Sequence, residues 1–289
     1  MHVELCRTRT SDGLFLCGQL MLPDETVRST LPVDTFLLVH GTASNFYAGG
    51  VLETFAGQAV ASGAAVLRVN TRGHDRMAAI PSERGAVAGG AAYERIAECC
   101  FDVTSWLDLL VARGFSRIAL IGHSMGAVKA IFSQARAAHS SVSCVVGISP
   151  PRFSYERLAS GIGGDEFGED FYRASQLVDD GRGSELISVR YPLPLMLTAD
   201  SFLAKYGPHD DYDIVRHLPD VACPTLIVLG TGSVANSSAF AGLPDEIQRL
   251  TIEHSRLALE LVEGANTVYS TCEDVPFVRT AAWLMSHGA

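Results

Sequence analysis

The stretch Gly122-His123-Ser124-Met125-Gly126 decides how this chain folds. It follows directly on a hydrophobic run, 117–121, that predicts a buried strand, and it precedes small residues that predict a helix over 125–138. A turn between a strand and a helix holds its serine exposed, and the glycines remove side chains that would collide where the turn is tightest. The position of the Gly-x-Ser-x-Gly pattern, rather than the pattern alone, therefore predicts a serine placed for chemistry.

On both sides of this turn, segments typical of strands and of helices alternate along the chain. An antiparallel hairpin is predicted at 3–9 and 14–22, and further strands are predicted at 35–39, 64–69, 117–121, 142–148, 224–229 and 257–262. Helices are predicted at 49–62, 93–113, 125–138, 244–256 and 274–286. This alternation predicts the α/β class, with a mostly parallel central sheet flanked by helices.

The alternation stops between Pro151 and Ala222, where the chain is richer in charged and aromatic residues. We therefore interpret 151–221 as an inserted helical cap, and 1–150 together with 222–289 as one α/β core. A chain of 289 residues is within the usual size of a single α/β unit, so no second large domain is expected.

The net charge of the chain is −10, and hydrophobic residues make up 47% of it. This acidity excludes nucleic acid as an expected partner, because binding to nucleic acid depends on Lys and Arg side chains that neutralise phosphates. It also argues against an anionic membrane surface, and no run approaches the roughly 18 apolar residues of a membrane span. The expected partner is a small molecule.

Seven cysteines are scattered along the chain without a Cys-x-x-Cys pair. This usage is typical of a reduced, cytoplasmic protein, and the first residues lack the apolar core of a signal peptide. No His-Glu-x-x-His motif or paired His/Cys spacing predicts a metal site, and no Gly-x-Gly-x-x-Gly opens a helix to hold a nucleotide. Neither a metal nor another cofactor is therefore expected.

Five short segments occur in the order that one known superfamily has them. They are His40-Gly41, Asn70-Thr71-Arg72-Gly73-His74, the Gly122–Gly126 turn, Pro224-Thr225-Leu226 and Glu263-Gly264-Ala265. With them the chain resembles the α/β-hydrolase superfamily over essentially its whole length. It is similar to the branch of lipase-like and serine aminopeptidase-like enzymes with a helical cap. The resemblance implies the α/β-hydrolase fold and a nucleophile elbow at the turn.

The resemblance also implies roles for individual residues. Ser124 takes the position of the nucleophile, and the backbone N–H groups of Thr42 and Met125 take the positions of the oxyanion hole. Residues that take supporting positions, which orient backbone or shape the loop beside the pocket, are His40, Arg72 and His74.

The chain departs from the family at the two residues that should serve the serine. Ser233 stands where the family has its acid, and Thr267 stands where the family has its histidine, next to Asn266. Threonine cannot take a proton from a serine hydroxyl near pH 7, and the loss of a triad member typically costs on the order of 10⁴-fold in rate. The triad is therefore predicted to be degenerate, with Ser233, Asn266 and Thr267 as polar pocket residues.

A substitute base would have to be another histidine. His209 and His217 lie in the predicted cap, which folds over the pocket in such enzymes, and they are the two candidates. His123 precedes the serine, but the two side chains are expected to project in different directions. The cap also carries aromatic residues, which indicate either an apolar or aromatic substrate or the core of the cap itself. They are Phe153, Tyr155, Phe167, Phe171, Tyr172, Tyr191, Phe202 and Tyr206.

Three functions remain open from the sequence. The first is hydrolase-type acyl chemistry on a small ester, thioester or amide, if another base is recruited. The second is a cofactor-free lyase, cyclase, isomerase or decarboxylase reaction in which the oxyanion hole stabilises an enolate. The third is a non-catalytic protein that binds a ligand in the retained pocket. The intact elbow favours an enzyme, because a protein that only binds has little need of a strained turn.

Overall fold

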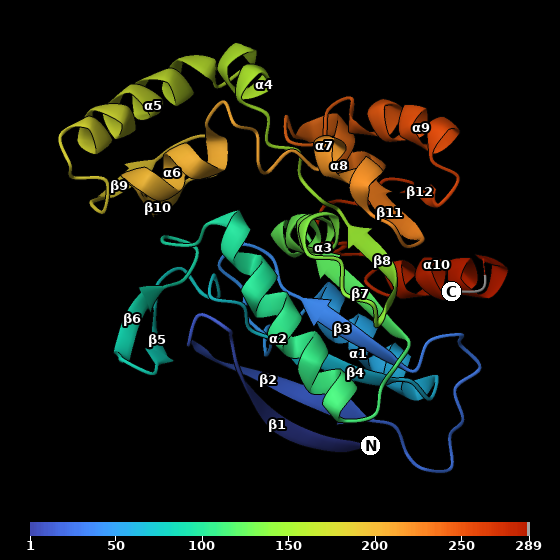
Figure 1. Ribbon diagram of the computed structural model, residues 1–289. Helices are drawn as coiled ribbons and strands as arrows, with labels where there is room; N and C mark the ends of the chain where they lie inside the picture. The colour runs from blue at the N-terminus through green and yellow to red at the C-terminus, as the bar shows by residue number, and fades with distance from the viewer. Residues whose placement is uncertain (288–289) are drawn as a thin grey trace.

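The computed structural model, which describes residues 1–287, contains one eight-stranded sheet with the order β1-β2-β4-β3-β7-β8-β11-β12 (Figure 1). The strands are β1 (His2–Arg9), β2 (Phe15–Leu22), β3 (Thr35–Val39), β4 (Ala65–Val69), β7 (Ile118–His123), β8 (Val142–Ile148), β11 (Thr225–Gly230) and β12 (Leu257–Val262). β1 and β2 form an antiparallel hairpin, β2 and β4 are antiparallel, and the pairings from β4 onward are parallel. β3 and β11 are buried at every position, as expected of strands covered on both faces.

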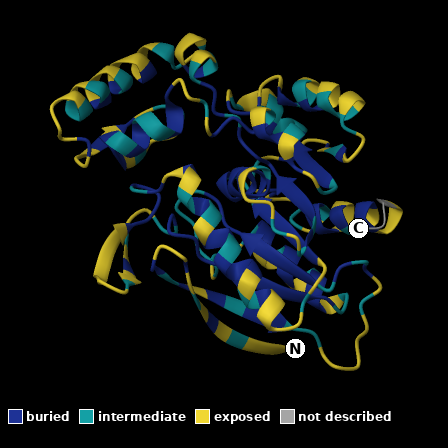
Figure 2. Ribbon diagram, viewed as in Figure 1, coloured by how far each residue is buried: buried dark blue, intermediate teal, exposed yellow. Residues whose placement is uncertain are grey.

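Helices cover both faces of this sheet. One face carries α2 (Cys99–Ala112), α3 (Met125–Arg136) and α9 (Leu243–Glu253), and the other carries α1 (Val51–Ala61) and α10 (Val275–His287). Trp106 and Ile131 are buried on the first face, and the rings of Phe36, Phe55 and Phe277 lie 5.2 to 6.4 Å apart on the second. Figure 2 shows the strands buried between the helices, whose outer sides are exposed. The α/β-hydrolase architecture is confirmed. In the part of the chain that the structure describes, no helix combines the length and the apolar character needed to cross a membrane.

The segment 151–221 is not wholly helical. It contains α4 (Tyr155–Ser160), α5 (Gly164–Asp179), β9 (Leu186–Val189), β10 (Leu195–Thr198), α6 (Ala199–Tyr206) and α7 (Ile214–His217), followed by a 3₁₀ turn at Leu218–Asp220. β9 and β10 pair as an antiparallel ribbon, which the prediction of a helical cap lacks. α4, α5 and α6 stand away from the sheet, whereas α7 packs on α3 of the core (Figure 1).

The aromatic residues of this segment mostly pack on one another. The rings of Phe167 and Phe202 lie 6.0 Å apart, those of Phe202 and Tyr206 lie 5.3 Å apart, and all three side chains are almost fully buried. The aromatics that indicated either a substrate or a core for the cap therefore serve mainly as its core.

Three further elements differ from the prediction. A ribbon of β5 (Ala78–Ser82) and β6 (Gly85–Gly89) forms where the sequence predicts no strand, because its alanine and glycine residues carry little strand signal. The helix predicted at 93–113 starts later, with a 3₁₀ turn at Ile96–Glu98 before α2. α8 (Thr231–Asn236) replaces a predicted loop after β11, although its glycine, serine, threonine and asparagine residues are poor helix formers.

Candidate active site

Ser124 lies on the turn between β7 and α3 in a strained backbone conformation, with φ 53° and ψ −123°. Its backbone N–H donates to the carbonyl of Ile148 at 2.8 Å, which ties the turn to β8. A Cβ at Gly122 would lie 2.2 Å from the carbonyl oxygen of Gly126, and a Cβ at Gly126 would lie 2.1 Å from that of Val39. Close backbone contacts therefore require both glycines of the motif.

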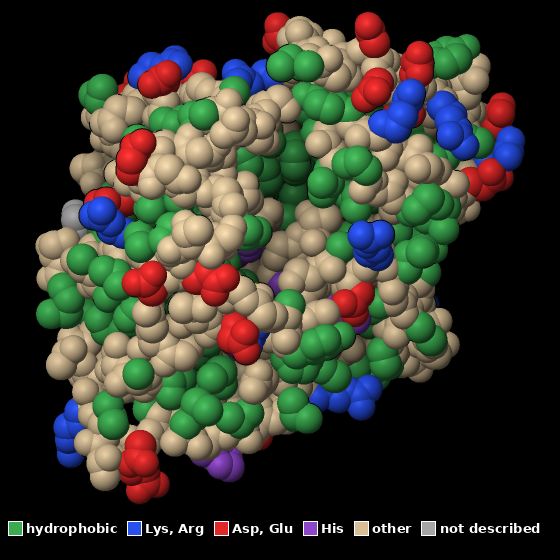
Figure 3. All heavy atoms as spheres, turned by 180° about the vertical axis from the view of Figure 1, so that it is seen from behind, with side chains coloured by type: hydrophobic (Ala, Val, Ile, Leu, Met, Phe, Trp, Pro, Cys, Tyr) green, Lys and Arg blue, Asp and Glu red, His purple; other side chains and the backbone are tan. Residues whose placement is uncertain are grey.

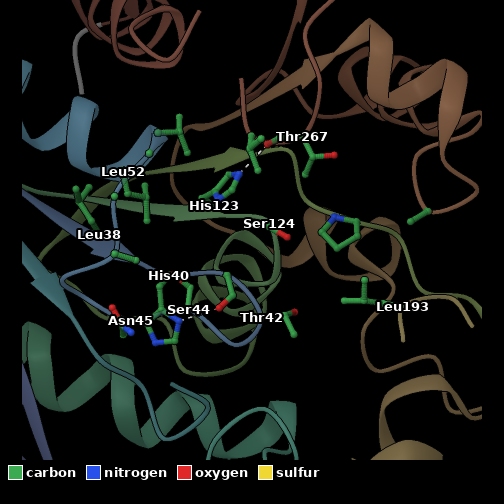
Figure 4. Close-up of a pocket in the computed structure, with 18 of the residues that line it drawn as sticks. Leu38, His40, Thr42, Ser44, Asn45, Leu52, His123, Ser124, Leu193 and Thr267 are labelled. Carbon is green, nitrogen blue, oxygen red and sulfur yellow. Dashed lines mark hydrogen bonds between the residues drawn. The ribbon is translucent and has the colours of Figure 1, made fainter. Parts of the chain in front are cut away.

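A cavity of about 450 Å³ includes Ser124 in its lining. Figure 3 shows one face of the molecule hollowed, with hydrophobic side chains deep in the hollow. In Figure 4, Ser124, His123 and Thr267 lie near one another, and His40 and Asn45 lie on the loop after β3. The apolar side chains of the lining are Leu38, Phe46, Ala48, Val51, Leu52, Val69, Pro151, Phe153, Pro192, Leu193, Ala239, Phe240 and Val268.

The loop after β3 runs close to Ser124. A Cβ at Gly41 would lie 3.2 Å from the Cβ of Ser124, so a larger residue would displace the loop. Nδ1 of His40 lies 2.8 Å from the carbonyl oxygen of Gly41. The N–H of Thr42 shares that trans peptide and therefore points the opposite way, away from His40. The N–H of Met125 opens α3 and has no acceptor within the helix. An oxyanion hole at these two N–H groups stays a prediction.

A chain of buried hydrogen bonds supports His40. Lys129 of α3 pairs with Glu94, Nζ to Oε2 at 2.5 Å, and donates to Oγ1 of Thr71 at 2.9 Å. The backbone N–H and the hydroxyl of Thr71 lie 3.2 and 3.3 Å from Nε2 of His40. Because the N–H only donates, Nε2 is the acceptor, and Nδ1 carries the proton that it donates to the carbonyl of Gly41. Burial lowers the pKa of His40 to about 3, so this ring is neutral.

Ser233 and Thr267 meet in the structure. Ser233 lies on α8 and Thr267 lies in the loop after β12, and their hydroxyl oxygens are 2.9 Å apart. Thr267 lines the pocket, whereas Ser233 is buried outside the lining. The acid and the histidine of a triad would be joined in the same manner, and the role of Ser233 and Thr267 as their replacements stays a prediction. Asn266 is exposed and donates to Oγ of Ser270 at 2.6 Å, so it does not join them.

The two cap histidines do not reach the pocket. The ring of His217 packs against Phe132 of α3 with centroids 5.0 Å apart, and its Nε2 lies 2.8 Å from the carbonyl oxygen of Asp211. His209 is exposed, and its carbonyl accepts a hydrogen bond from Arg216. Neither residue belongs to the lining, because this end of the segment packs on α3 instead of over Ser124. A substitute base from the cap has no support in this geometry.

His123 lines the pocket together with Ser124. Its Nε2 lies 2.8 Å from the carbonyl oxygen of Thr267 (Figure 4), so Nε2 carries the proton and Nδ1 is an acceptor. Burial lowers the pKa of His123, which favours the neutral ring. The loop after β12 makes this contact across 144 residues, and no local rule predicts it. Within residues 1–287 the hydroxyl of Ser124 has no hydrogen bond to this ring or to another side chain.

Arg72 and His74 lie outside the lining and hold neighbouring loops. Nη2 of Arg72 donates to the buried carboxylate of Asp102 at 2.9 Å. Nδ1 of His74 lies 2.9 Å from Asp75, whose other oxygen accepts from Asn45 at 2.7 Å. Because Asn45 belongs to the lining, this pair connects the loop after β4 with the loop after β3.

Most residues of the lining were missed by the sequence reasoning, among them Asn45 and Arg68. Of the cap aromatics named above, Phe153 is the one that lines the pocket, and nothing in the sequence distinguishes it from the others. Asn45 is a polar loop residue of ordinary type. Arg68 does carry a signal, because it interrupts the otherwise apolar run 64–69 with a charge in a strand expected to be buried.

The chain matches the model of a family described as the alpha/beta hydrolase family over residues 36–279. No curated protein matches it. Solved structures with a similar fold include the alpha/beta hydrolase GrgF from Penicillium sp. sh18, with 15% sequence identity, 99% of each chain covered and a TM-score of 0.69. Est1E from Butyrivibrio proteoclasticus, solved with ferulic acid bound, has 12% identity, coverage of 97% of this chain and 98% of its own, and a TM-score of 0.66.

The esterase Pf2001 from Pyrococcus furiosus is a third similar structure, with 15% identity, coverage of 100% of this chain and 92% of its own, and a TM-score of 0.62. At such identities the likeness shows the fold alone. The family match extends from β3 into α10 and includes the Ser124 turn and the loops that meet there. This chain belongs to the alpha/beta hydrolase family.

Proposed function

We propose that this protein is an enzyme that acts on the carbonyl group of a small, largely apolar compound, and that oxyanion stabilisation rather than an activated serine drives the reaction. Ester hydrolysis is the first reaction to test, because the family and the esterases of similar fold both favour it. The apolar lining and the volume of about 450 Å³ suit a small organic molecule.

The observation that carries the proposal is the hydrogen bond of 2.9 Å between Ser233 and Thr267. The two positions meet beside Ser124 as an acid and a base would, but neither hydroxyl takes a proton near pH 7. The backbone around the serine keeps its strained turn, its glycines and the supported Gly41–Thr42 peptide. What the site retains is therefore suited to stabilise charge, and what it lacks is a means to activate the serine.

The chemistry follows from these groups. A carbonyl carbon next to the hydroxyl of Ser124 would direct its oxygen to the N–H groups of Thr42 and Met125. When water adds to that carbon, negative charge develops on the oxygen, and each N–H donor contributes about 10²–10³-fold to the rate. An oxyanion hole and binding alone give about 10³–10⁴-fold over water, which is the acceleration we expect here.

A second candidate is a non-hydrolytic reaction, such as that of a lyase, cyclase, isomerase or decarboxylase. The observation that favours it is the hydroxyl of Ser124, which makes no side-chain hydrogen bond in the described residues and is therefore available to bind substrate. In this case the same two N–H groups would stabilise an enolate. Exchange of α-protons of a small ketone in heavy water, followed by NMR, would detect it.

The test combines labelling with a fluorophosphonate probe and turnover of p-nitrophenyl acetate and butyrate. We expect slow labelling, measurable turnover, and a loss of less than about 10-fold in Ser124→Ala, because the serine is not activated. Gly41→Ala should lower turnover at least about 10-fold, because its Cβ would displace the Thr42 N–H. Ser238→Ala, another serine of the lining, is the matched control and should keep the rate.

Two results would contradict the proposal. Rapid labelling at Ser124 with a loss of about 10⁴-fold in Ser124→Ala would mean an activated serine, with His123 as the first base to examine. Absence of both ester turnover and α-proton exchange would favour a protein that only binds its ligand.

A further inference from the structure

Arg68 of β4 is a buried charge in the wall of the Ser124 pocket. It is 6% exposed and belongs to the same lining as Ser124 and Thr267. It lies one residue before the carboxyl end of β4, and ligands of open α/β sheets bind at such ends. A guanidinium in the interior is costly unless a carboxylate or several acceptors satisfy it.

The guanidinium of Arg68 is only partly satisfied by the protein. One nitrogen, Nη2, donates to the carbonyl of Ala48. Over residues 1–287 no carboxylate oxygen lies within the 4.0 Å of an ion pair, and the other N–H groups of its fork have no acceptor. Burial lowers the pKa of Arg68, and the exposed Glu53 offsets part of this at longer range. An arginine carries five N–H donors, so most of them stay available.

The start of α1 lies beside Arg68 in the same wall. Ala48, Gly49, Gly50, Val51 and Leu52 all belong to the lining. Gly50 caps this helix of 11 residues with φ 90°, and no side chain accepts from its first N–H groups. The N-terminus of a helix carries a partial positive charge and free N–H donors. Gly49 and Gly50 place no side chains at this end of α1, and the carboxylate of Glu53 in the first turn lies 3.2 Å from where a Cβ of Gly49 would be.

The rest of the wall supplies no negative charge. Among the lining residues that the structure describes, Arg68 is the one with a permanent charge, and His40 and His123 are both shifted toward the neutral form. A ligand with one negative charge would neutralise Arg68. A dianion such as a phosphate would leave an excess charge in an apolar cavity without a second cation.

We infer that Arg68 and the N-terminus of α1 form a subsite for a carboxylate, and that the substrate carries one in addition to its reacting carbonyl. The statement that the substrate carries a carboxylate rests on the proposed function, whereas the binding of a carboxylate at this subsite does not. The subsite explains why a cation lies in a pocket that is otherwise suited to an apolar molecule. It assigns the substrate to the class of small carbonyl compounds with a carboxylate group.

The test is calorimetric binding of octanoate and of octanamide, which has the same shape without the charge. Wild type and Ser124→Ala should bind octanoate about 10- to 100-fold more tightly than octanamide, the range of hydrogen bonds to charged groups. Arg68→Met should lose this preference, and Arg68→Lys should keep part of it. Arg173→Gln, which removes an exposed arginine outside the pocket, should bind as wild type does.

Equal affinities for the two ligands in wild type would overturn the inference. An undiminished preference in Arg68→Met would also overturn it, because the carboxylate would then bind elsewhere, such as at the N–H groups near Ser124. If Arg68→Met does not fold, the variant Glu53→Lys, which changes an exposed residue of α1, tests the subsite instead. This variant should bind octanoate about 2- to 5-fold more tightly than wild type and octanamide with the same affinity. An unchanged affinity for octanoate would count against the subsite.

Binding and turnover separate the two proposals. A carboxylate preference that depends on Arg68, without turnover of any carbonyl compound, would count against the proposed function alone. Ester turnover without that preference would count against the subsite alone.

Discussion

At Ser124 the backbone holds a φ of 53° that residues with a side chain rarely adopt. Such strain costs of order 1–3 kcal/mol and persists only where the surroundings enforce it. Here the hydrogen bond to Ile148 and the contacts of Gly122 and Gly126 enforce it. Under the proposed function, this strain persists without groups that activate the serine.

Ser124→Gly should therefore stabilise the protein by about 1 kcal/mol relative to Ser124→Ala. Glycine adopts the positive φ without a steric penalty, and this gain exceeds its extra entropy in the unfolded chain. Urea unfolding of the two variants measures the difference, and equal stabilities would show that the turn is not strained.

Ser233 and Thr267 are the residues at which a triad could be rebuilt. Their hydroxyls already touch, at 2.9 Å, so Ser233→Asp and Thr267→His together should place an acid on an imidazole beside Ser124. We expect the double variant to hydrolyse p-nitrophenyl butyrate at least about 10-fold faster than wild type, and each single variant to gain less. Asn266→His is the matched control, because Asn266 is exposed and outside the lining. A gain in that control would mean that the position of the imidazole is irrelevant.

At the scale of elements, the loop after β3 depends on groups from α3 and from the segment before α2. The buried Lys129–Glu94 pair connects through Thr71 to His40, which in turn holds the carbonyl of Gly41. Removing one member of a buried pair leaves an uncompensated charge, whereas removing both charges is often nearly neutral.

Lys129→Met should thus lower the free energy of unfolding by about 3–5 kcal/mol. The double variant Lys129→Met with Glu94→Gln should recover most of this loss, because no unpaired carboxylate is left. Chemical denaturation of the three proteins tests it, and a double variant no more stable than the single one would exclude the ion pair as the cause.

The elements that could be predicted from sequence are those with strong local patterns. The apolar run 35–39, the strand before Gly122 and the helix after it all form as expected. The segments β5, β6 and α8 could not be predicted, because weak formers adopt these structures under tertiary contacts.

The candidate site likewise has residues that local sequence patterns predict and residues whose positions depend on long-range contacts. The sequence predicts that Ser233 and Thr267 replace the acid and the histidine of a triad, because in the family each of these positions has a fixed place after a strand. The position of His123 depends on a carbonyl 144 residues away, and the failure of His209 and His217 to line the pocket depends on how α7 packs on α3. Both are long-range contacts that periodicity does not describe.

At the scale of the whole molecule, polar groups of the cap are buried against the core. Lys205 of α6 is 3% exposed, and its Nζ has no hydrogen-bond partner in residues 1–287, nor have the hydroxyls of Tyr206 and Tyr212. The Nζ lies 5.7 Å from the centroid of each tyrosine ring. One oxygen of Glu94 in the core is likewise unpaired. The contact between cap and core is therefore not optimised for stability.

Burial lowers the pKa of Lys205 to about 8, with Glu94 opposing the shift and Lys129 adding to it. At this side chain the folded state binds fewer protons than the unfolded state between about pH 8 and 10.4, so Lys205 contributes a rise of stability with pH in this window. Burial raises the pKa of the thiols of Cys6, Cys99, Cys144 and Cys223, and these contribute a fall over the same range once unfolded thiols ionise. Below pH 8 the cost is present in full and amounts to about 3 kcal/mol. Lys205→Met should raise the free energy of unfolding at pH 7, and this advantage over wild type should shrink between pH 8 and 9.5, because the thiols are common to both proteins.

Urea unfolding at pH 7, 8 and 9.5 measures this for both proteins. The range ends below pH 10 because burial raises the pKa of Tyr206 and of Tyr212, which lowers stability once unfolded tyrosines ionise. A difference in stability between Lys205→Met and wild type that stays constant from pH 7 to 9.5 would contradict the prediction.

The hydroxyl pair of Ser233 and Thr267 also affects how the reaction rate should depend on pH. In a triad enzyme the imidazole must lose its proton before catalysis, so the rate steps up as pH rises through its pKa. Under the proposed function the hydroxyl of Thr267 takes the place of the imidazole, and burial lowers the pKa of His40 to about 3 and also lowers that of His123. We expect kcat/KM for an ester to show no sigmoidal step from pH 6.5 to 9, and the variant with a rebuilt triad to acquire one. An enzyme of this kind would keep its rate in compartments of changing acidity, where protonation of a catalytic imidazole would switch off an enzyme with a triad.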